Sequence, residues 1–416
     1  MAPAREPMHS KASFETRSDP VPVKMIAAAG RRNLAIRVAA GLAGFCTFIN
    51  LYSPQAILPL LSDEFGAGAK EISAIMTAST LAVALMAPFS GTVSDVLGRK
   101  RVIVTAMVVL AIPTVFSAFA ESLHALVIWR FVQGLVMPPI FAVTIAYLGE
   151  ELSAKEATTV TGIYTSGASL GGFTGRLLTG VLADAVSWHF AFLCLAAMTV
   201  VGAGIVAVLL PRERRFVKSE GLIASGRQML RHFRNPQLVA TYAVGFGVLF
   251  NFIATFTFIS FRLAAPPYDL SPTLLGVIFV TYLSGTAATP LTGRFVSRFG
   301  RRSFVLFVIA VWVLGIALTM LGPLWVILVG LSICACCGML CQSVSTGYVA
   351  ITAQAGRSSA VGLYVTSFYL GGSFGAAIGG VAWTVAGWPA CVAMIAAMLA
   401  IMGAIVAITW RRVQPQ

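Results

Sequence analysis

Two stretches of this 416-residue chain match each other 200 positions apart. Residues 162–188 read GIYTSGASLGGFTGRLLTGVLADAVSW, and residues 362–388 read GLYVTSFYLGGSFGAAIGGVAWTVAGW. Five glycines, a tyrosine, a leucine and a tryptophan keep their places in both copies. Because the offset of 200 is about half of the chain, we expect two copies of one unit joined in tandem. Both copies are apolar and long enough to cross a bilayer.

The composition is typical of a polytopic membrane protein. Of its residues 58% are hydrophobic and 11% are charged, and the mean hydropathy is +0.87. Soluble domains carry about a quarter charged residues, so this chain has too few to cover a surface that faces water. Apolar runs of about 20 residues recur along it, each enough to span the hydrocarbon core. We therefore expect an all-α membrane protein.

The net charge of +14 has a distribution that indicates membrane topology. All but four of the 29 Lys and Arg residues lie in the N-terminal tail, in alternate loops or at the C-terminus. This positive-inside pattern predicts a multi-pass membrane protein with both termini in the cytoplasm. The lipid bilayer is thus the expected partner, and a nucleic acid is not.

Twelve spans in two six-helix repeats account for the apolar runs. Their expected positions are 36–60, 72–91, 102–120, 124–148, 157–184, 188–210, 236–262, 272–293, 303–321, 324–349, 358–384 and 388–410. The expected organisation is a disordered cytoplasmic tail (1–33), an N-terminal half (34–210), a cytoplasmic linker (211–235), a C-terminal half (236–410) and a cytoplasmic tail (411–416). Two further matches support the repeat: Pro88 and Gly91 with Pro290 and Gly293, and Gly44 and Asn50 with Gly245 and Asn251.

The loop between spans two and three carries a characteristic motif, whose spaced residues are Gly91, Asp95, Gly98, Arg99 and Lys100. It resembles the G-x-x-x-D-x-x-G-R-K loop of the major facilitator superfamily, and it lies between the same two spans. The resemblance extends over nearly the whole chain after the tail. It implies the twelve-helix fold of secondary transporters, in a branch that exports drugs or sugars, and a place in the inner (plasma) membrane.

In that family the loop's acid acts as a conformational latch. The resemblance implies that Asp95 docks against the start of span eleven, near Ser358, and helps to hold the outward-open state. The second copy of the loop has Ser297 where the acid would stand, so the charged latch is expected in one half only. The alternative is a loop that only fixes the topology.

Span four contains Arg130 and Gln133, followed by a glycine. A charge at the centre of a membrane helix costs about 2.5–3.5 kcal/mol, so it normally faces a cavity or a partner. R-x-x-Q-G resembles the family's span-four motif, which is implicated in proton coupling. The alternative is a structural arginine that donates to carbonyls of span one, and the two roles are compatible.

Span five resembles the antiporter motif G-x-x-x-G-P-x-x-G-G of exporters, which lets span five pack on span eight. Its helix-packing glycines are Gly167, Gly171, Gly172 and Gly175, and those of the second copy are Gly371, Gly372 and Gly375. Gly172 replaces the proline of the motif and Arg176 its last glycine, which weakens the assignment to export. The repeat partner of Arg176 is Ala376. We therefore expect Arg176 to face the cavity; a local acceptor is the alternative.

The spans hold polar residues but almost no acids. Where many drug antiporters have an acid in span one, this chain has neutral Asn50, Tyr52 and Gln55. Two buried cations without buried anions make the cavity potential positive, which suits anionic or neutral polar substrates. The expected substrate and proton pathway consists of Asn50, Tyr52, Gln55, Arg130, Gln133, Arg176 and Asn251.

These features predict a proton-coupled exporter that works by alternating access of its two halves. The alternative within transport is a proton-symport importer of an organic anion or another small metabolite. A membrane enzyme or lipid flippase is disfavoured, because no catalytic constellation and no nucleotide-binding loop is present in the sequence. We expect a monomer that binds a small-molecule substrate and protons and that needs no cofactor and no metal.

Overall fold

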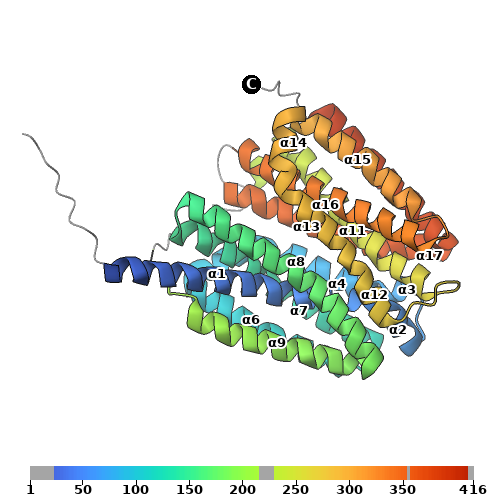
Figure 1. Cartoon of the computed structure of the whole chain (residues 1–416), viewed down its shortest axis with the longest axis horizontal. Coiled ribbons are helices and arrows are strands. Elements are labelled where there is room, and N and C mark those ends of the chain that lie inside the picture. The colour runs from blue at the N-terminus through green and yellow to red at the C-terminus, as the bar shows by residue number, and fades with distance from the viewer. Residues whose placement is uncertain (1–22, 215–228, 354–356, 411–416) are drawn as a thin grey trace, which may run out of the picture.

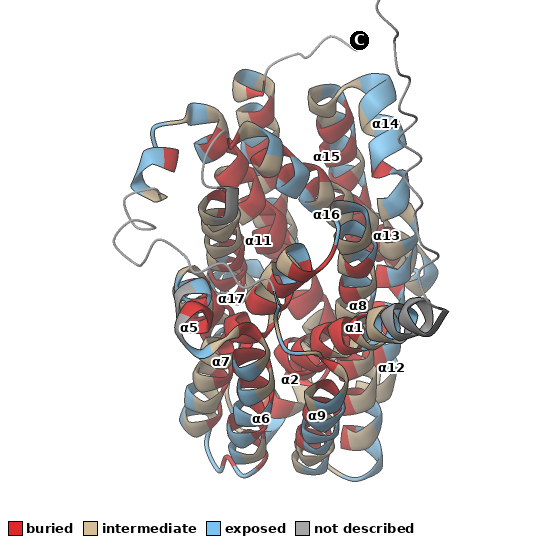
Figure 2. Ribbon diagram, turned by 90° about the vertical axis from the view of Figure 1, so that its left-hand side faces the viewer, coloured by how far each residue is buried: buried red, intermediate tan, exposed pale blue. Residues whose placement is uncertain are grey.

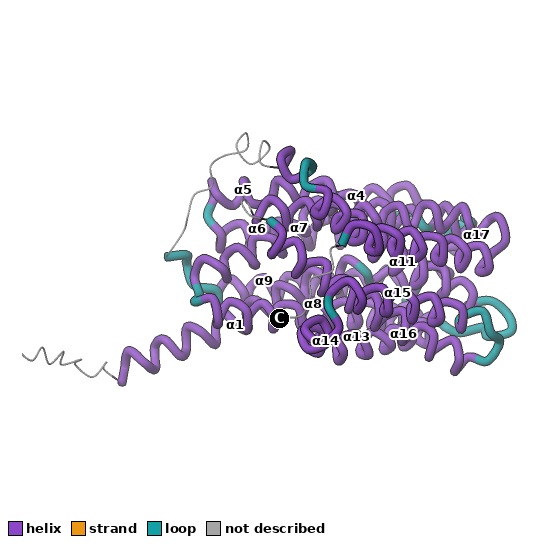
Figure 3. Tube along the Cα trace, turned by 90° about the horizontal axis from the view of Figure 1, so that it is seen from above, coloured by secondary structure: helices purple, strands orange, loops and turns teal. Residues whose placement is uncertain are grey.

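The computed structural model describes residues 23–214, 229–353 and 357–410, which form helices and no strand (Figure 3). The N-terminal half contains α1 (Val23–Leu51), η1 (Ser53–Ala56), α2 (Leu58–Glu64), α3 (Ala69–Ile72), α4 (Ala74–Met86), η2 (Ala87–Phe89), α5 (Ser90–Leu97), α6 (Arg99–Ala118), α7 (Leu123–Glu151), α8 (Ala154–Ala185) and α9 (Trp188–Leu209). The C-terminal half contains α11 (Pro236–Ala264), α12 (Pro272–Ile278), η3 (Phe279–Thr281), α13 (Tyr282–Ala288), η4 (Thr289–Leu291), α14 (Thr292–Phe299), α15 (Arg301–Leu318), α16 (Leu324–Thr352) and α17 (Arg357–Thr409).

The helices account for the predicted spans. Ten helical segments of the described chain are long and apolar enough to cross a membrane. The last of them is two helices, because Ala386 and Gly387 have non-helical backbone angles inside α17. Gly387 has φ +61°, a conformation that glycine adopts at little cost. Helix α8, with 32 residues rich in Gly, Ser and Thr, is the remaining span. The predicted all-helical membrane fold is confirmed.

Short polar residues mark where several helices begin. Ser122, Ser187, Asn235 and Ser271 accept hydrogen bonds from backbone N–H groups in the first turns of α7, α9, α11 and α12. These side chains satisfy donors that the helix itself leaves unpaired. Helix α8 begins with a capping box, in which Ser153 and Glu156 exchange hydrogen bonds. The bonds from Ser153 lower the pKa of Glu156.

The internal repeat has a direct structural counterpart. Helix α1 packs along α8, and α11 packs along α17, as the most extensive helix pair within each half. A Cβ added to Gly171 would lie 2.3 Å from the carbonyl oxygen of Phe45, and one added to Gly371 would lie 1.9 Å from that of Phe246. Since no side chain fits in either place, the same pair of glycines lets the helix backbones touch in both halves.

The two ends of the bundle differ in charge, so one is called the basic end and the other the acidic end. The basic end is the end at which α5 meets α6 (residues 97–101) and α14 meets α15 (residues 299–302). The acidic end is the opposite one, which carries Asp63, Glu64 and Asp269. In Figure 1 the two halves converge near α2, α3 and α12 and diverge towards the first turns of α1 and towards α14.

Glycines of the repeat also show that the two halves lie closer together at the acidic end than at the basic end. Near the acidic end, a Cβ on Gly180 would lie 2.3 Å from the Pro272 oxygen, and one on Gly380 would lie 2.9 Å from Cα of Lys70. Each of these glycines meets the opposite half. At the basic end of the same helices, a Cβ on Gly162 or Gly362 would have no atom within 4 Å. The halves are therefore in tight contact at the acidic end.

Two boundaries differ from those expected. Helix α1 begins at Val23, inside the stretch expected to be a disordered tail (1–33), of which residues 1–22 lie outside the described residues. The first span is also interrupted: α1 ends at Leu51, and η1 and α2 complete the crossing. Pro54 and Pro59 lack the N–H that a continuous helix would need, which explains the interruption. Of the expected linker (211–235), residues 215–228 lie outside the described residues, as does the tail 411–416.

Candidate functional site

The polar residues expected in the pathway form two clusters and one separate residue. Tyr52, Gln55 and Arg176 lie together where the two halves meet, whereas Asn50, Arg130 and Gln133 lie together inside the N-terminal half. Asn251 is remote from both clusters, between α11 and the last part of α17. Six of the seven residues are buried inside the helix bundle, whose buried residues are red in Figure 2, and Tyr52 is half-buried.

The first group, called the seam cluster, is organised around Arg176 of α8. Its Nε and Nη2 donate to Oε1 of Gln55 at 2.9 and 2.7 Å, and Nη1 donates to the Gly172 oxygen at 2.7 Å. Nη2 also lies 3.4 Å from the hydroxyl of Tyr282, which belongs to the C-terminal half. Gln55 in turn donates to Oγ1 of Thr257 in α11 at 3.0 Å. The cluster therefore connects the two halves.

Aromatic rings enclose the guanidinium of Arg176. Its Cζ lies 4.6, 4.4 and 4.8 Å from the ring centroids of Tyr52, Phe279 and Tyr282. The negative faces of such rings attract a cation, and the attraction strengthens where water is excluded. Arg176 is 1% exposed, and among its described contacts none is a carboxylate. The cation thus keeps its charge uncompensated at the seam, where a bound anion would be stabilised.

The second group, called the inner cluster, fixes the end of α1. Nη1 and Nη2 of Arg130 donate to the carbonyl oxygens of Asn50 and Leu51 at 2.9 and 2.5 Å. Nη1 also donates to Oε1 of Gln133 at 2.5 Å. Helix α1 ends at Leu51, so these carbonyls lack helical partners. The Asn50 oxygen also accepts from the Ser53 hydroxyl at 3.0 Å, whereas Arg130 is the described donor to the Leu51 oxygen. This geometry corresponds to the structural alternative considered for Arg130.

Hydroxyl groups complete the inner cluster. Asn50 donates to Thr199 at 2.8 Å and accepts from Thr114 at 3.1 Å, and Gln133 donates to Thr114 at 2.6 Å. The cluster thereby ties α1, α6, α7 and α9 together. In the C-terminal half, Asn251 occupies the position equivalent to Asn50, but it donates only a weak 3.3 Å contact to Sδ of Met402. Among the described residues, the hydrogen-bond network around Asn50 therefore has no counterpart around Asn251.

The glycines of span five pack against span one. Cβ atoms on Gly167, Gly171 and Gly175 would lie 2.1, 2.3 and 2.3 Å from carbonyl oxygens of α1. These three glycines contact α1, because that face of α8 is turned towards the same half. Span five also packs on span eight, through Gly180 and through Gly276 of α12, whose added Cβ would lie 3.0 Å from the Arg176 oxygen. Gly172 points towards Arg176 and Tyr52 and so borders the seam cluster.

The glycines of the second copy pack on α11 in the same way. Gly375 approaches the Phe250 oxygen as Gly175 approaches that of Ile49, both with 2.3 Å between the oxygen and an added Cβ. Gly372 differs, because a Cβ there would lie 2.7 Å from the side chain of Leu249 and not from a backbone atom.

The loop expected to act as a latch is held inside the N-terminal half. Oδ1 of Asp95 lies 2.8 Å from Nη1 of Arg99, and Arg99 also pairs with Glu150 of α7 at 2.7 Å. Gly98 has φ +88° and Gly300 has φ +75°, so both copies of the turn use glycine for a left-handed conformation. Gly91 and Lys100 flank this turn, and the backbone N–H of Lys100 donates to Glu213 at 3.4 Å. Residues 354–356, next to the expected docking place near Ser358, lie outside the described residues.

We expect Asp95→Asn to lower transport at least about tenfold, which corresponds to about 1.4 kcal/mol, without loss of the fold. Arg99 keeps Glu150 as a partner in the state described here, so the substitution leaves no buried charge unpaired. The loss would arise in the opposite state, in which the carboxylate holds the halves together. Initial transport rates, normalised to the amount of monodisperse protein, measure this effect. A variant with the rates of the parent protein would remove the latch role.

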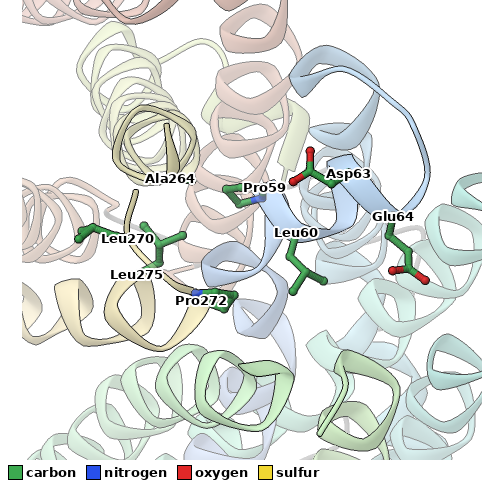
Figure 4. A pocket seen from close by; sticks show the side chains of 8 residues that line it. All are labelled: Pro59, Leu60, Asp63, Glu64, Ala264, Leu270, Pro272 and Leu275. Atoms are coloured by element: carbon green, nitrogen blue, oxygen red, sulfur yellow. The ribbon is translucent and has the colours of Figure 1, made fainter. Parts of the chain in front are cut away.

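A cavity of about 500 Å³ opens at the seam on the acidic end. Helix α2 contributes Pro59, Leu60, Asp63 and Glu64, and the C-terminal half contributes Ala264, Leu270, Pro272 and Leu275 (Figure 4). Near it, the backbone N–H of Thr273 donates to Asp184 of α8 at 3.0 Å across the seam. The cavity walls come from both halves, so a relative movement of the halves would change its shape.

Sequence reasoning missed the partners supplied by other helices. Thr114, Thr199 and Thr257 are ordinary residues of apolar helices, and Phe279 and Tyr282 follow no motif. No local signal identifies them, because their role depends on which helix lies opposite. Within the described ranges, no group of three or more His, Cys, Asp or Glu side chains is placed to hold a metal ion.

Comparison with known proteins agrees with this architecture. The family model described as Major Facilitator Superfamily matches residues 40–268 and 244–416. The chain is 33% identical over 372 residues to "Inner membrane transport protein YnfM" of Escherichia coli (strain K12), covering 88% of each protein. It is 28% identical over 358 residues to "Uncharacterized MFS-type transporter YybF" of Bacillus subtilis (strain 168), covering 86% of this chain and 89% of the relative.

A solved structure shows the same fold. The crystal structure of nucleoside transporter NupG superimposes with a TM-score of 0.73 at 16% identity, and it covers 92% of this chain and 100% of that chain. The family match, the relatives and the shared fold agree with the repeated helical architecture. The chain belongs to the major facilitator superfamily and is a multi-pass membrane protein of the secondary-transporter type, not an enzyme.

Proposed function

We propose that this transporter is a proton-coupled exporter of small anionic or neutral polar molecules. It would lie in the inner (plasma) membrane, with the basic end and both termini in the cytoplasm. The relative named as an inner membrane protein and the charge asymmetry of the loops support this placement. We further propose that it acts as a monomer.

The seam cluster is the observation that carries the proposal. It joins the halves through Gln55, Thr257, Arg176 and Tyr282 on the acidic side of the bundle. Alternating access requires such a contact to break when the opposite end closes. A substrate anion that reaches Arg176 would compete for the guanidinium with Gln55 and so would favour opening. With the basic end in the cytoplasm, the described arrangement is the inward-facing one.

Export is supported by the glycine-rich sequence of span five, which resembles the antiporter motif despite its two departures. Proton coupling is supported by the R-x-x-Q-G sequence of span four. The guanidinium groups of Arg130 and Arg176 stay charged near pH 7 and do not carry the proton. Two carriers are compatible with the arrangement: the substrate itself, or Asp184, whose carboxylate accepts a hydrogen bond across the seam.

The test is transport in proteoliposomes driven by an imposed pH gradient. One pH unit corresponds to about 1.4 kcal/mol, so it supports up to about tenfold accumulation at one proton per substrate. The probe is whichever labelled metabolite of a panel is depleted in cells that overexpress the protein, relative to the empty vector. We expect accumulation against the substrate gradient and its collapse on addition of a protonophore.

The controls distinguish the direction of substrate transport from its coupling to protons. Substrate movement opposite to the proton flow supports the exporter, and movement with it would establish the importing symporter instead. Uptake that ignores the protonophore would mean a facilitator, and the proton-coupled proposal would be withdrawn. The Asp184→Asn variant tests which group carries the proton. Loss of gradient-driven uptake would show that the Asp184 carboxylate carries it, and retained uptake would show that the substrate carries it.

A further inference from the structure

A second cavity, of about 420 Å³, lies on the outer side of the N-terminal half at the basic end. It is formed by the end of α5, the first turns of α6 and the end of α9 with the residues that follow it. The lining residues are Leu97, Lys100, Arg101, Val104, Thr105, Ala207, Arg212 and Glu213. Lys100 also belongs to the latch motif, but the substrate and proton pathway proposed above does not include this cavity.

The cavity walls are amphipathic. Lys100, Arg101 and Arg212 supply three cations, and Glu213 supplies one carboxylate, so the lining has a net charge of +2. Glu213 is already engaged, because it accepts from the backbone N–H of Lys100 at 3.4 Å. Within the described ranges, the three cationic side chains make no ion pair and no side-chain hydrogen bond. Leu97, Val104 and Ala207 form the apolar wall.

The position of the cavity matches the boundary between headgroups and acyl chains. Helix α6 begins at Arg99 and α9 ends at Leu209, so the cations stand where the helices leave the membrane. Beyond the cavity towards the bilayer centre, Val108 and Ile205 are exposed on the same two helices. An acyl chain could therefore continue from the cavity along the surface of α6 and α9.

We propose that this cavity binds the headgroup of an anionic phospholipid, with the phosphate between Lys100, Arg101 and Arg212. Clustered basic residues beside a membrane helix attract anionic lipids. The site also includes the start of the chain that connects the halves: the Pro211 oxygen accepts from Tyr147 at 3.0 Å, and the N–H of Arg214 donates to Glu151. A bound lipid would therefore link the start of α6 to the segment that follows α9.

Native mass spectrometry of the delipidated full chain tests the proposal. Phosphatidylglycerol and cardiolipin are titrated in parallel with phosphatidylcholine, and soluble glycerol 1-phosphate provides the headgroup without the chains. We expect the two anionic lipids to bind at least tenfold more tightly than phosphatidylcholine, and glycerol 1-phosphate not to displace them at equal concentration. Displacement at equal concentration would overturn the lipid assignment, because the acyl chains would then contribute nothing.

Two variants and a matched control locate the site. R101Q/R212Q should weaken binding of phosphatidylglycerol about 25-fold, since each cation near the surface contributes about fivefold. R294Q/R298Q removes two charges from exposed positions of α14 at the same end of the molecule, and it should change the affinity less than twofold. Equal weakening by both double variants would show diffuse attraction and no site. Ala207→Phe, which fills the apolar wall without altering charge, should weaken binding at least fivefold, and an unchanged affinity would also overturn the proposal.

Discussion

Replacing Arg176 with methionine should lower substrate affinity about ten- to a hundredfold and leave the thermal stability of the protein unchanged or raised. The affinity falls because the substrate loses charge-assisted hydrogen bonds, which contribute about 1.5–3 kcal/mol. The stability holds because two effects oppose each other: Oε1 of buried Gln55 loses its donor, but a guanidinium that is buried without a carboxylate among its described contacts is removed. Replacing a poorly compensated buried charge with an apolar side chain of similar volume is often neutral or stabilising.

Arg130→Met is the matched control, since it removes the same group from the inner cluster. There the guanidinium donates to the Leu51 carbonyl at the end of α1 and to Oε1 of buried Gln133, so its loss should destabilise the protein by about 1–3 kcal/mol for each of these acceptors left without a partner. Substrate binding by equilibrium dialysis and thermal unfolding in detergent give the two readouts. If Arg176→Met lowered the melting temperature by several degrees and bound substrate normally, Arg176 would be structural and the preference for anions would lose its main support.

The second large effect is expected at the glycines that let helices touch. Gly171→Ala should destabilise the protein by about 3 kcal/mol or more, because the new Cβ would lie 2.3 Å from the Phe45 oxygen and 2.8 Å from its Cα. Backbone atoms cannot move aside as a flexible side chain can, so α1 and α8 would have to separate. Gly371→Ala should have a similar effect in the other half, where the corresponding distance is 1.9 Å from the Phe246 oxygen.

Gly162→Ala and Gly362→Ala are the controls within the same two helices. Neither added Cβ would have an atom within 4 Å, and alanine is favoured over glycine in a helix by about 1 kcal/mol. Both controls should therefore be as stable as the parent protein or more so. Thermal unfolding of the four variants, with the yield of monodisperse protein, measures the contrast. Equal stability of Gly171→Ala and Gly162→Ala would contradict close packing of α1 on α8.

The recurrence of residues 162–188 at 362–388 was sufficient to predict two similar halves, because a duplicated segment folds in the same way twice. It also singled out α8, whose Gly, Ser and Thr content keeps it out of the ten helical segments found by length and hydropathy. Hydropathy and the positions of basic loops predicted helices and membrane insertion. These properties depend on local chain chemistry, so one sequence reveals them.

The partners of the polar residues depended on tertiary structure. Arg130 and Arg176 are both arginines within apolar helices, yet one satisfies the end of α1 and the other lies at the seam between the halves. Gly167, Gly171 and Gly175 of span five lie against span one, whereas the expected packing of span five on span eight is made by Gly180 and Gly276. Helix rotation and the identity of the neighbouring helix decide these contacts, and both are set by packing over the whole bundle. The sequence by itself therefore determined the repeated helical membrane fold, and the tertiary structure alone decided which buried charge stands where the halves meet.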